Sequence, residues 1–89
     1  MIKQKMTWIV YILCCKDGTF YCGCTTNIDR RIKQHNNGTG AKYTRSRSPV
    51  KLVYSKKIST KSDALKLEHK IKCLSRLEKI RLINFKIEI

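Results

Sequence analysis

An Asp-Gly turn between two short apolar segments constrains the fold of this chain more than any other feature. Residues 7–15 (TWIVYILCC) are a nearly continuous apolar run rich in β-branched and aromatic side chains, which predicts a central strand buried on both faces. The next four residues, Lys16-Asp17-Gly18-Thr19, carry the strongest short-range hairpin signal. Residues 20–24 (FYCGC) predict the returning strand, and Gly23 inside it indicates a bulge or a close backbone approach.

A helix, a loop and a third strand are predicted next. Polar residues at 25–27 can cap a helix over 28–37, which ends at an Asn-Asn-Gly sequence typical of a C-cap. Ile28 and Ile32 give this helix one apolar face, with Arg31 and His35 as neighbours four residues apart beside it. Residues 38–49 predict a basic loop rich in Gly and Ser, and residues 50–58 predict the third strand.

Two further helices complete the expected fold. Thr60, with Asp63 as a weak capping-box partner, begins a helix over 61–74, and Ser75 with Glu78 forms a capping box for a short helix to about residue 84. The order β-β-α-β-α-α predicts a small α+β domain, a three-stranded antiparallel sheet flanked by helices.

The length of 89 residues allows one domain with a small core. We expect that domain over residues 7–84, preceded by a disordered N-terminal extension over 1–6. Residues 85–89 form a C-terminal tail, expected to be a strand or disordered.

The charge of the chain indicates a polyanionic partner. The formal net charge is +14, and residues 30–62 contain ten Lys or Arg and no acidic residue. A solvated basic surface would account for such a composition, but an uninterrupted basic stripe favours nucleic acid. No segment is long enough to be a transmembrane helix, and the N-terminus lacks a signal-peptide pattern. We therefore expect a cytoplasmic protein without a membrane partner.

The five cysteines do not suggest a metal centre or a disulfide framework. Their number is odd in a chain without a secretion signal. Neither Cys14-Cys15 nor Cys22-Gly23-Cys24 has the spacing of a zinc knuckle, and neighbouring strand positions point to opposite faces. We expect buried, reduced thiols and no structural zinc.

Glu68 is the most informative residue of the second half. The apolar positions of its helix are Ala64, Leu65, Leu67, Ile71 and Leu74. Glu68 falls within that stripe, and a carboxylate directed toward a core needs a compensating cation or hydrogen bonds. Two interpretations stay open: an ion pair with a buried arginine such as Arg31, or a ligand for a hard divalent ion such as Mg²⁺.

Several other side chains also allow a structural interpretation when each is considered alone. Tyr11 and Tyr21 are typical of buried strand tyrosines, and Tyr54 is expected in the core. Arg31 alone indicates a surface charge, and His35 alone indicates a cation near a helix C-terminus. Tyr43 lies among basic residues and can stack on a nucleobase.

Taken together, these residues fall into five segments with a familiar order. The segments are Val10-Tyr11-Ile12, Tyr21-Cys22-Gly23, residues 29–36 (DRRIKQHN), residues 40–45 (GAKYTR) with 49–54 (PVKLVY), and Glu68. In this register the chain resembles the GIY-YIG nuclease superfamily, and more narrowly its small single-domain bacterial branch, the YhbQ-like proteins. The resemblance covers about residues 7–83.

The resemblance implies hydrolysis of phosphodiester bonds with one divalent ion, Mg²⁺ or Mn²⁺. Tyr11 would be the general base, Tyr21 would position water and phosphate, Arg31 would stabilise phosphoryl charge, and His35 would relay a proton. Glu68 would be the metal ligand. A tyrosine of ordinary pKa needs nearby positive charge to act as a base, and Arg31 and the metal would supply it. The expected nucleic-acid-binding residues are Arg30, Lys33, Lys42, Tyr43, Arg45 and Arg47.

The sequence thus predicts a metal-dependent endonuclease acting on DNA in preference to RNA. Structure-sensitive cutting and a link to DNA repair are further hypotheses. The alternatives are a non-catalytic nucleic-acid-binding module of the same fold and an RNA- or ribosome-associated basic protein. A protein partner is left open.

Overall fold

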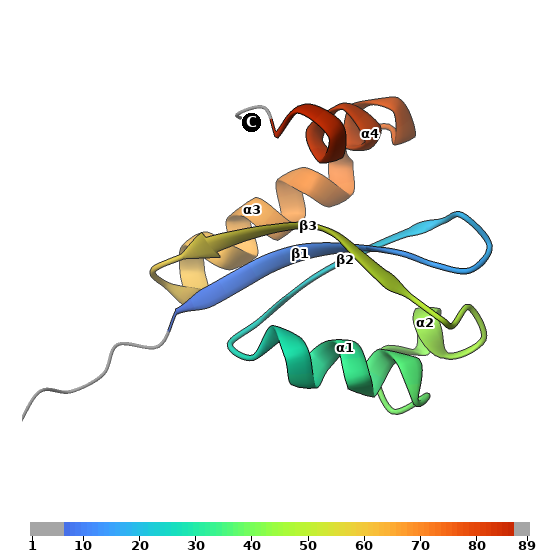
Figure 1. The fold of residues 1–89 in the computed structure, drawn as a ribbon. Helices are drawn as coiled ribbons and strands as arrows, with labels where there is room; N and C mark the ends of the chain where they lie inside the picture. Colours follow the sequence, from blue (N-terminus) through green and yellow to red (C-terminus); the bar gives the residue numbers. More distant parts are fainter. Residues whose placement is uncertain (1–6, 87–89) are drawn as a thin grey trace, which may run out of the picture.

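The computed structural model describes residues 7–86, which form a three-stranded sheet with helices on both sides (Figure 1). The elements, in chain order, are β1 (Trp8–Cys14), β2 (Phe20–Thr25), α1 (Ile28–Asn36), α2 (Lys42–Arg45), β3 (Lys51–Ile58), α3 (Lys61–Cys73) and α4 (Arg76–Phe85). The expected α+β class and antiparallel sheet are confirmed. The extension over 1–6 and the last part of the expected tail, 87–89, lie outside the described residues.

Strand β1 is the central strand of the sheet. The strand order is β2-β1-β3, and both pairings are antiparallel. The hairpin turn places Leu13 opposite Tyr21 and Tyr11 opposite Gly23. On the other side, the register shifts by one residue between Ile12 and Leu13, so the irregularity of the sheet lies in the β1–β3 pairing.

Two hydrophobic clusters lie on the two faces of β1. Val10 and Ile12 point toward α3 and α4 and pack with Ala64, Ile71 and Leu82. The alternate residues of the same strand, Tyr11 and Leu13, belong to a second cluster on the side of α1, which also contains Cys15, Val50, Ile28 and Ile32. Figure 1 shows α1 and α2 on one side of the sheet and α3 and α4 on the other. The prediction of a strand buried on both faces is confirmed.

Side-chain caps set the position of α1 and fix it to β3. The Asn27 side chain accepts a hydrogen bond from the backbone N–H of Arg30, so Asn27 is the N-cap among the three residues expected to supply one. At the other end, the Asn36 amide pairs with the backbone of Val50: its oxygen accepts from the Val50 N–H at 2.6 Å. The last turn of α1 therefore lies against the start of β3.

Helices α3 and α4 begin where the sequence predicted. Thr60 caps α3 by accepting from the Asp63 N–H, and Ser75 and Glu78 form the complete capping box of α4. Not every apolar position of α3 faces inward. Leu65 is 47% exposed, because the inward positions follow Ala64, Leu67 and Ile71.

The basic loop contains an element that the sequence analysis missed. Residues 42–45 form the short helix α2, although the whole of 38–49 was expected to be a loop. Thr44 in this helix is completely buried. The loop therefore carries a side chain into the interior, next to α1.

Gly23 is required by the close approach of Tyr11. A Cβ atom at residue 23 would lie 2.6 Å from the Tyr11 hydroxyl oxygen and 2.8 Å from its ring. The sequence predicted a bulge or a close backbone approach at this glycine, and the structure shows instead the close approach of a side chain, that of Tyr11. The Tyr11 hydroxyl thus passes over β2 at the one position without a side chain.

No helix within residues 7–86 is long and apolar enough to cross a membrane.

Candidate active site

Tyr11 and His35 meet in the interior between the sheet and α1. Tyr11 comes from β1 and is 1% exposed, and His35 comes from the last turn of α1 and is completely buried. The Tyr11 hydroxyl lies 3.1 Å from His35 Nε2. His35 is therefore not an exposed helix-terminal cation, the interpretation that its position alone suggested.

A third residue, Thr44 of α2, fixes the protonation of the imidazole ring. Its hydroxyl donates to the Ala41 carbonyl at 3.0 Å and lies 2.7 Å from His35 Nδ1. With the Thr44 hydroxyl hydrogen directed to Ala41, the threonine oxygen is left to accept from His35 Nδ1–H, and we therefore assign the Nδ1–H tautomer. His35 Nε2 then carries a lone pair and accepts the hydrogen bond from the Tyr11 hydroxyl.

The surroundings of these groups favour their neutral forms. Burial lowers the pKa of His35, and the nearby Arg31 charge lowers it further. Burial also raises the pKa of Tyr11 to about 12, while Arg31 acts in the opposite direction. The pair is thus a neutral phenol donating to a neutral imidazole, with a hydrogen-bonded path from Tyr11 through His35 to Thr44.

Two residues of this arrangement were missed by the sequence analysis. Thr44 was quoted in the motif over 40–45 but was given no role. Gly40 was also quoted without a role, yet a Cβ there would lie 2.6 Å from His35 Nδ1 and 2.9 Å from His35 Cα. The local signal, a Gly-x-x-x-Thr pattern in a basic loop, does not reveal that both residues pack on a histidine at the end of the preceding helix.

Tyr21 and Arg31 lie beside the Tyr11–His35 pair. The Tyr21 ring centroid is 5.2 Å from that of His35, and Tyr21 is partly exposed at the edge strand β2. The Arg31 guanidinium donates to the Gln34 side-chain oxygen at 3.0 Å and is close enough to influence the pKa values of both Tyr11 and His35. The fold therefore brings together four of the five expected site residues: Tyr11, Tyr21, Arg31 and His35.

The expected metal ligand, Glu68, lies on α3, on the side of the sheet opposite to α1. Its backbone carbonyl is near the Cys22 thiol, and its carboxylate raises the pKa of Cys24 in addition to the larger effect of burial. Its carboxylate forms an ion pair with Lys72, with 2.7 Å between Oε2 and Nζ. The suggested partner Arg31 is thus wrong: Arg31 binds Gln34, and the cation beside Glu68 is Lys72.

The donor atoms around Glu68 are compatible with a weakly coordinated divalent ion. Within residues 7–86, no three His, Cys, Asp or Glu side chains are grouped as metal ligands. A single carboxylate with 18% exposure, already beside one ammonium group, fits Mg²⁺ or Mn²⁺ that keeps several waters and takes phosphate oxygens from a substrate. It does not fit a site built from protein ligands alone.

The cysteines are free thiols that differ in exposure. Cys15 and Cys22 are buried, Cys14 and Cys24 are half-buried, and Cys73 is exposed. Burial of Cys22 raises the pKa of its thiol to about 12, so this thiol stays protonated. The expectation of buried thiols therefore does not extend to Cys73.

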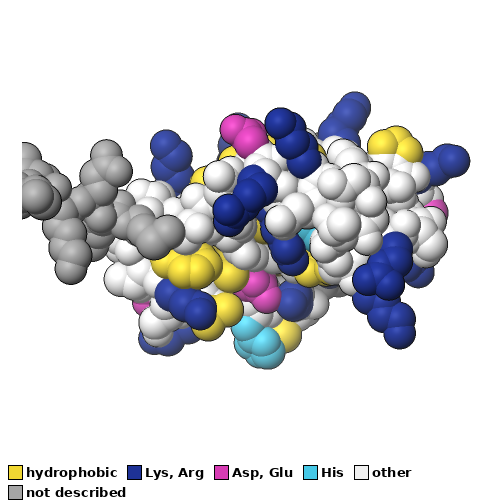
Figure 2. All heavy atoms as spheres, turned by 90° about the horizontal axis from the view of Figure 1, so that it is seen from below, with side chains coloured by type: hydrophobic (Ala, Val, Ile, Leu, Met, Phe, Trp, Pro, Cys, Tyr) yellow, Lys and Arg dark blue, Asp and Glu magenta, His cyan; other side chains and the backbone are white. Residues whose placement is uncertain are grey.

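Most of the expected nucleic-acid-binding residues lie on α1 and α2. Arg30, Lys33, Lys42 and Arg45 are exposed on these two helices, and Figure 2 views the molecule from this side, where dark blue side chains far outnumber magenta ones. Arg47 differs from the others. It is ion-paired with Asp17, and its guanidinium lies over the Tyr43 ring at 4.1 Å, so it has a structural role as well.

Replacement of Thr44 tests the hydrogen-bond path. Thr44→Val keeps the volume but removes the acceptor for the buried His35 Nδ1–H, so we expect a loss of about 1–3 kcal/mol in the free energy of unfolding. Thr44→Ser keeps the hydroxyl and should lose clearly less. Urea unfolding measures both values, and ¹⁵N spectra of the His35 ring should show the Nδ1–H tautomer in wild type. An Nε2–H tautomer in the wild-type protein would contradict the assignment.

The pH dependence of stability tests the neutral state of His35. Because burial depresses the folded-state pKa of His35 below the unfolded value of about 6.5, the unfolded chain binds the proton more readily. The stability due to neutral His35 is therefore present above about pH 6.5 and is lost as the pH falls from there toward the folded pKa. Urea unfolding from pH 8 to about pH 5 should show this loss in wild type.

Two histidine variants separate this effect from other titrations. His35→Gln should remove the loss between about pH 7 and 5. His69→Gln, at an exposed residue of α3, should retain it. Equal profiles for wild type and His35→Gln would mean that another group titrates.

Comparison with known proteins places these residues in a family. The model of the GIY-YIG catalytic domain matches residues 7–81. The chain is 53% identical over 75 residues to a UPF0213 protein of Staphylococcus saprophyticus, with 84% of this chain and 92% of that protein covered. It is also 53% identical over 74 residues to a UPF0213 protein of Natronomonas pharaonis, with 83% and 87% covered.

Solved structures agree with the fold. The solution structure of the UPF0213 protein BH0048 from Bacillus halodurans is 49% identical, has a TM-score of 0.60 and covers 91% of this chain and 86% of its own. The solution structure of the Enterococcus faecalis protein EF2693 is 40% identical, has a TM-score of 0.62 and covers 99% and 95%. With a family model matched from β1 into α4, the chain belongs to the GIY-YIG catalytic domain family and is similar to its small UPF0213 members.

Proposed function

We propose that this protein is a metal-dependent endonuclease that hydrolyses phosphodiester bonds in DNA. The observation that carries the proposal is the hydrogen-bonded path from Tyr11 through His35 to Thr44, with Arg31 beside it. A buried tyrosine needs only one hydrogen-bond partner. A tyrosine held on the unprotonated nitrogen of a buried, neutral histidine has an acceptor for its proton.

The proposed roles follow from the positions of these groups. As an attacking water gives a proton to the Tyr11 oxygen, the Tyr11 hydroxyl proton passes to His35 Nε2, and the Thr44 oxygen holds His35 Nδ1–H throughout. This transfer avoids a free tyrosinate, which a pKa of about 12 disfavours. The Arg31 guanidinium, held by Gln34, binds the phosphoryl oxygens on which charge develops.

Glu68 is the residue that would hold a divalent ion. The ion, when bound, would stabilise charge on the scissile phosphate and the leaving oxygen. Lys72 would have to move from the carboxylate to make room, and its long flexible side chain with 52% exposure allows that movement. Glu68 would therefore exchange one cation for another without a change in the fold.

One observation favours a second candidate function. Glu68 already has a complete partner in Lys72 at 2.7 Å, so its position does not require a metal. A non-catalytic nucleic-acid-binding module with the same basic face would keep this ion pair. We rank this function second because it gives no reason for the Tyr11–His35–Thr44 path.

Cleavage of labelled DNA tests the proposal. Single-stranded, duplex and branched substrates should be incubated with Mg²⁺, with Mn²⁺ or with EDTA. We expect cutting with either ion and none with EDTA, because one carboxylate with waters accepts both ions. A preference for branched DNA would support structure-sensitive cutting and a link to repair. Binding without cutting under every metal condition would favour the non-catalytic module.

A further inference from the structure

A small cavity lies between the part of the site that contains His35 and the part that contains Glu68. Its volume is about 190 Å³, and it is lined by aromatic rings, apolar side chains and two lysines: Ile12, Phe20, Tyr21, Cys22, Tyr43, Ile71, Lys72 and Lys79. Tyr21 contacts the His35 ring on one side, and Lys72 contacts Glu68 on the other. Whatever enters the cavity therefore lies next to the groups proposed to act on phosphate.

The lining matches a flat ring carried on an anionic backbone. Tyr21 and Tyr43 have nearly parallel rings, with an interplanar angle of 26° and 6.0 Å between centroids, and Phe20 adds a third ring. Aromatic faces of this kind stack on nucleobases of any sequence. The volume is below that of pockets for drug-sized ligands, roughly 300–1,000 Å³, so one base matches the cavity better than a base pair does.

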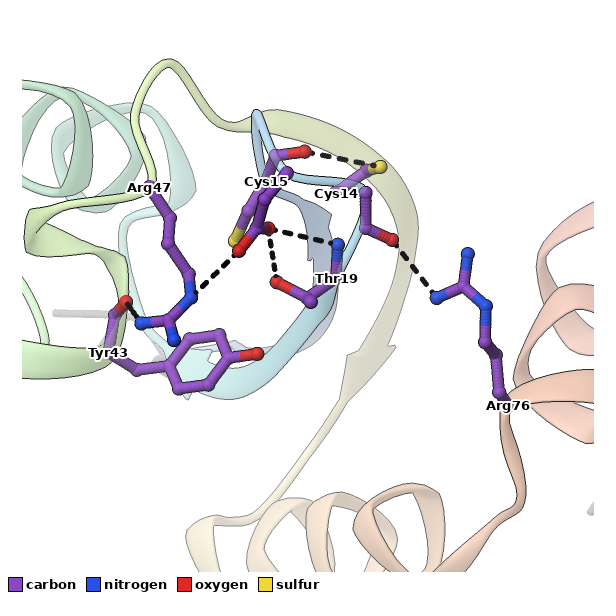
Figure 3. Close-up of polar contacts among 8 residues, drawn as sticks. Cys14, Cys15, Thr19, Tyr43, Arg47 and Arg76 are labelled. Atoms are coloured by element: carbon purple, nitrogen blue, oxygen red, sulfur yellow. Dashed lines mark hydrogen bonds and ion pairs between the residues drawn. The ribbon is translucent and has the colours of Figure 1, made fainter.

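The Tyr43 ring is held in place before any ligand arrives. Arg47 donates to the Tyr43 carbonyl at 2.7 Å, lies over the ring at 4.1 Å and is itself bound to Asp17 in the β1–β2 turn. Figure 3 shows Arg47 and Tyr43 together on one side of the β1–β2 turn and Arg76 on the other side, where it donates to the Gly18 carbonyl. A preformed ring loses little conformational entropy on binding.

The positive charge at the cavity rim also favours a base carried on an anionic backbone. Lys72 and Lys79 provide two ammonium groups, and the protein carries a net charge of +14. A free aromatic metabolite would use the rings, but it would bring no anion for Lys79, and Lys72 is already paired with Glu68. A base with its adjoining phosphates uses both the rings and the positive charge.

We propose that this cavity is a subsite for one unpaired nucleobase of the nucleic acid bound at the site. The inference rests on the proposed function for the identity of the polymer. The nucleotide next to the reacting phosphate is unpaired when it binds, and Tyr43, Tyr21 and Phe20 hold its base. The subsite selects unpaired nucleotides and not a base sequence, because its aromatic walls are available to every base.

Binding in EDTA tests the subsite without cleavage. Fluorescence anisotropy compares octathymidylate with an abasic oligomer of equal length and phosphate number. Wild type should bind the oligomer with bases roughly five- to a hundredfold more tightly, the range expected for stacking of one base. Tyr43→Leu should reduce this ratio severalfold, since Tyr21 and Phe20 remain, whereas Tyr43→Phe should preserve it.

A second aromatic residue provides the control. Phe85→Leu removes a 73% exposed ring that does not line the cavity, and this variant should keep the wild-type ratio. Equal affinity of wild type for the two oligomers, or an unchanged ratio in Tyr43→Leu, would overturn the subsite. A protein that shows the ratio but never cuts DNA would support the subsite and contradict only the endonuclease.

Discussion

Replacement of Glu68 by glutamine is expected to reduce metal-dependent cleavage at least roughly a thousandfold, because a single carboxylate would hold the ion and an ion stabilises several kcal/mol of transition-state charge. The fold should change little. The Glu68 carboxylate, 18% exposed, pairs with the 52% exposed Lys72 four residues along the same helix, and an i,i+4 pair contributes about 0.3–0.5 kcal/mol. Cleavage rates with saturating Mg²⁺ or Mn²⁺, together with a thermal melt, measure both effects.

Asp63 supplies the matched control for this experiment. It lies on the same helix, is exposed and belongs to the first turn. Asp63→Asn should cleave at the wild-type rate. A Glu68→Gln protein that cuts as fast as Asp63→Asn would exclude Glu68 as the metal ligand, and the Lys72 ion pair would then be its whole role.

Replacement of Tyr11 by phenylalanine is expected to lower the cleavage rate by roughly a hundred- to ten-thousandfold, the range typical for loss of a general base. The ring would remain packed between β1 and α1, since only the hydroxyl is removed. His35 Nε2 would lose its donor at 3.1 Å, at a cost of about 1–3 kcal/mol in the free energy of unfolding. DNA affinity in EDTA should be unchanged.

Tyr54→Phe separates a chemical role from a structural one. Tyr54 is also buried in the sheet, but it belongs to the cluster on the side of α3 and α4. This variant should keep full activity. If Tyr11→Phe and Tyr54→Phe cut DNA equally well, Tyr11 is a core residue, and the Tyr11–His35 hydrogen bond only stabilises the fold.

The fold was predictable because its signals are local. The Asp-Gly turn fixed the hairpin, and the Ser75–Glu78 capping box fixed the start of α4. The apolar run around Tyr11 predicted a strand with two buried faces because alternate side chains point in opposite directions. The one missed element lies where the local signal is weak: α2 has four residues and no side-chain cap.

The site was predictable only as a list of residues. Sequence alone marked Tyr11, Tyr21, Arg31, His35 and Glu68, chiefly because their order resembles a known family. It assigned no role to Thr44 or Gly40, whose contacts with His35 depend on how the loop after α1 returns. It also suggested Arg31 for Glu68, although the partner is one turn along the same helix.

The sequence by itself determined the order of the elements and the basic character of the protein, because turn signals, apolar periodicity and charge belong to short segments. It also supplied the candidate site residues, through their resemblance to a known family. Only the tertiary structure decided which side chains form hydrogen bonds with one another and which line a common cavity. Tyr11, His35 and Thr44 come from β1, α1 and α2, and the cavity wall joins β1, β2, α2, α3 and α4. Such contacts depend on how separate elements pack, and no local pattern specifies that packing.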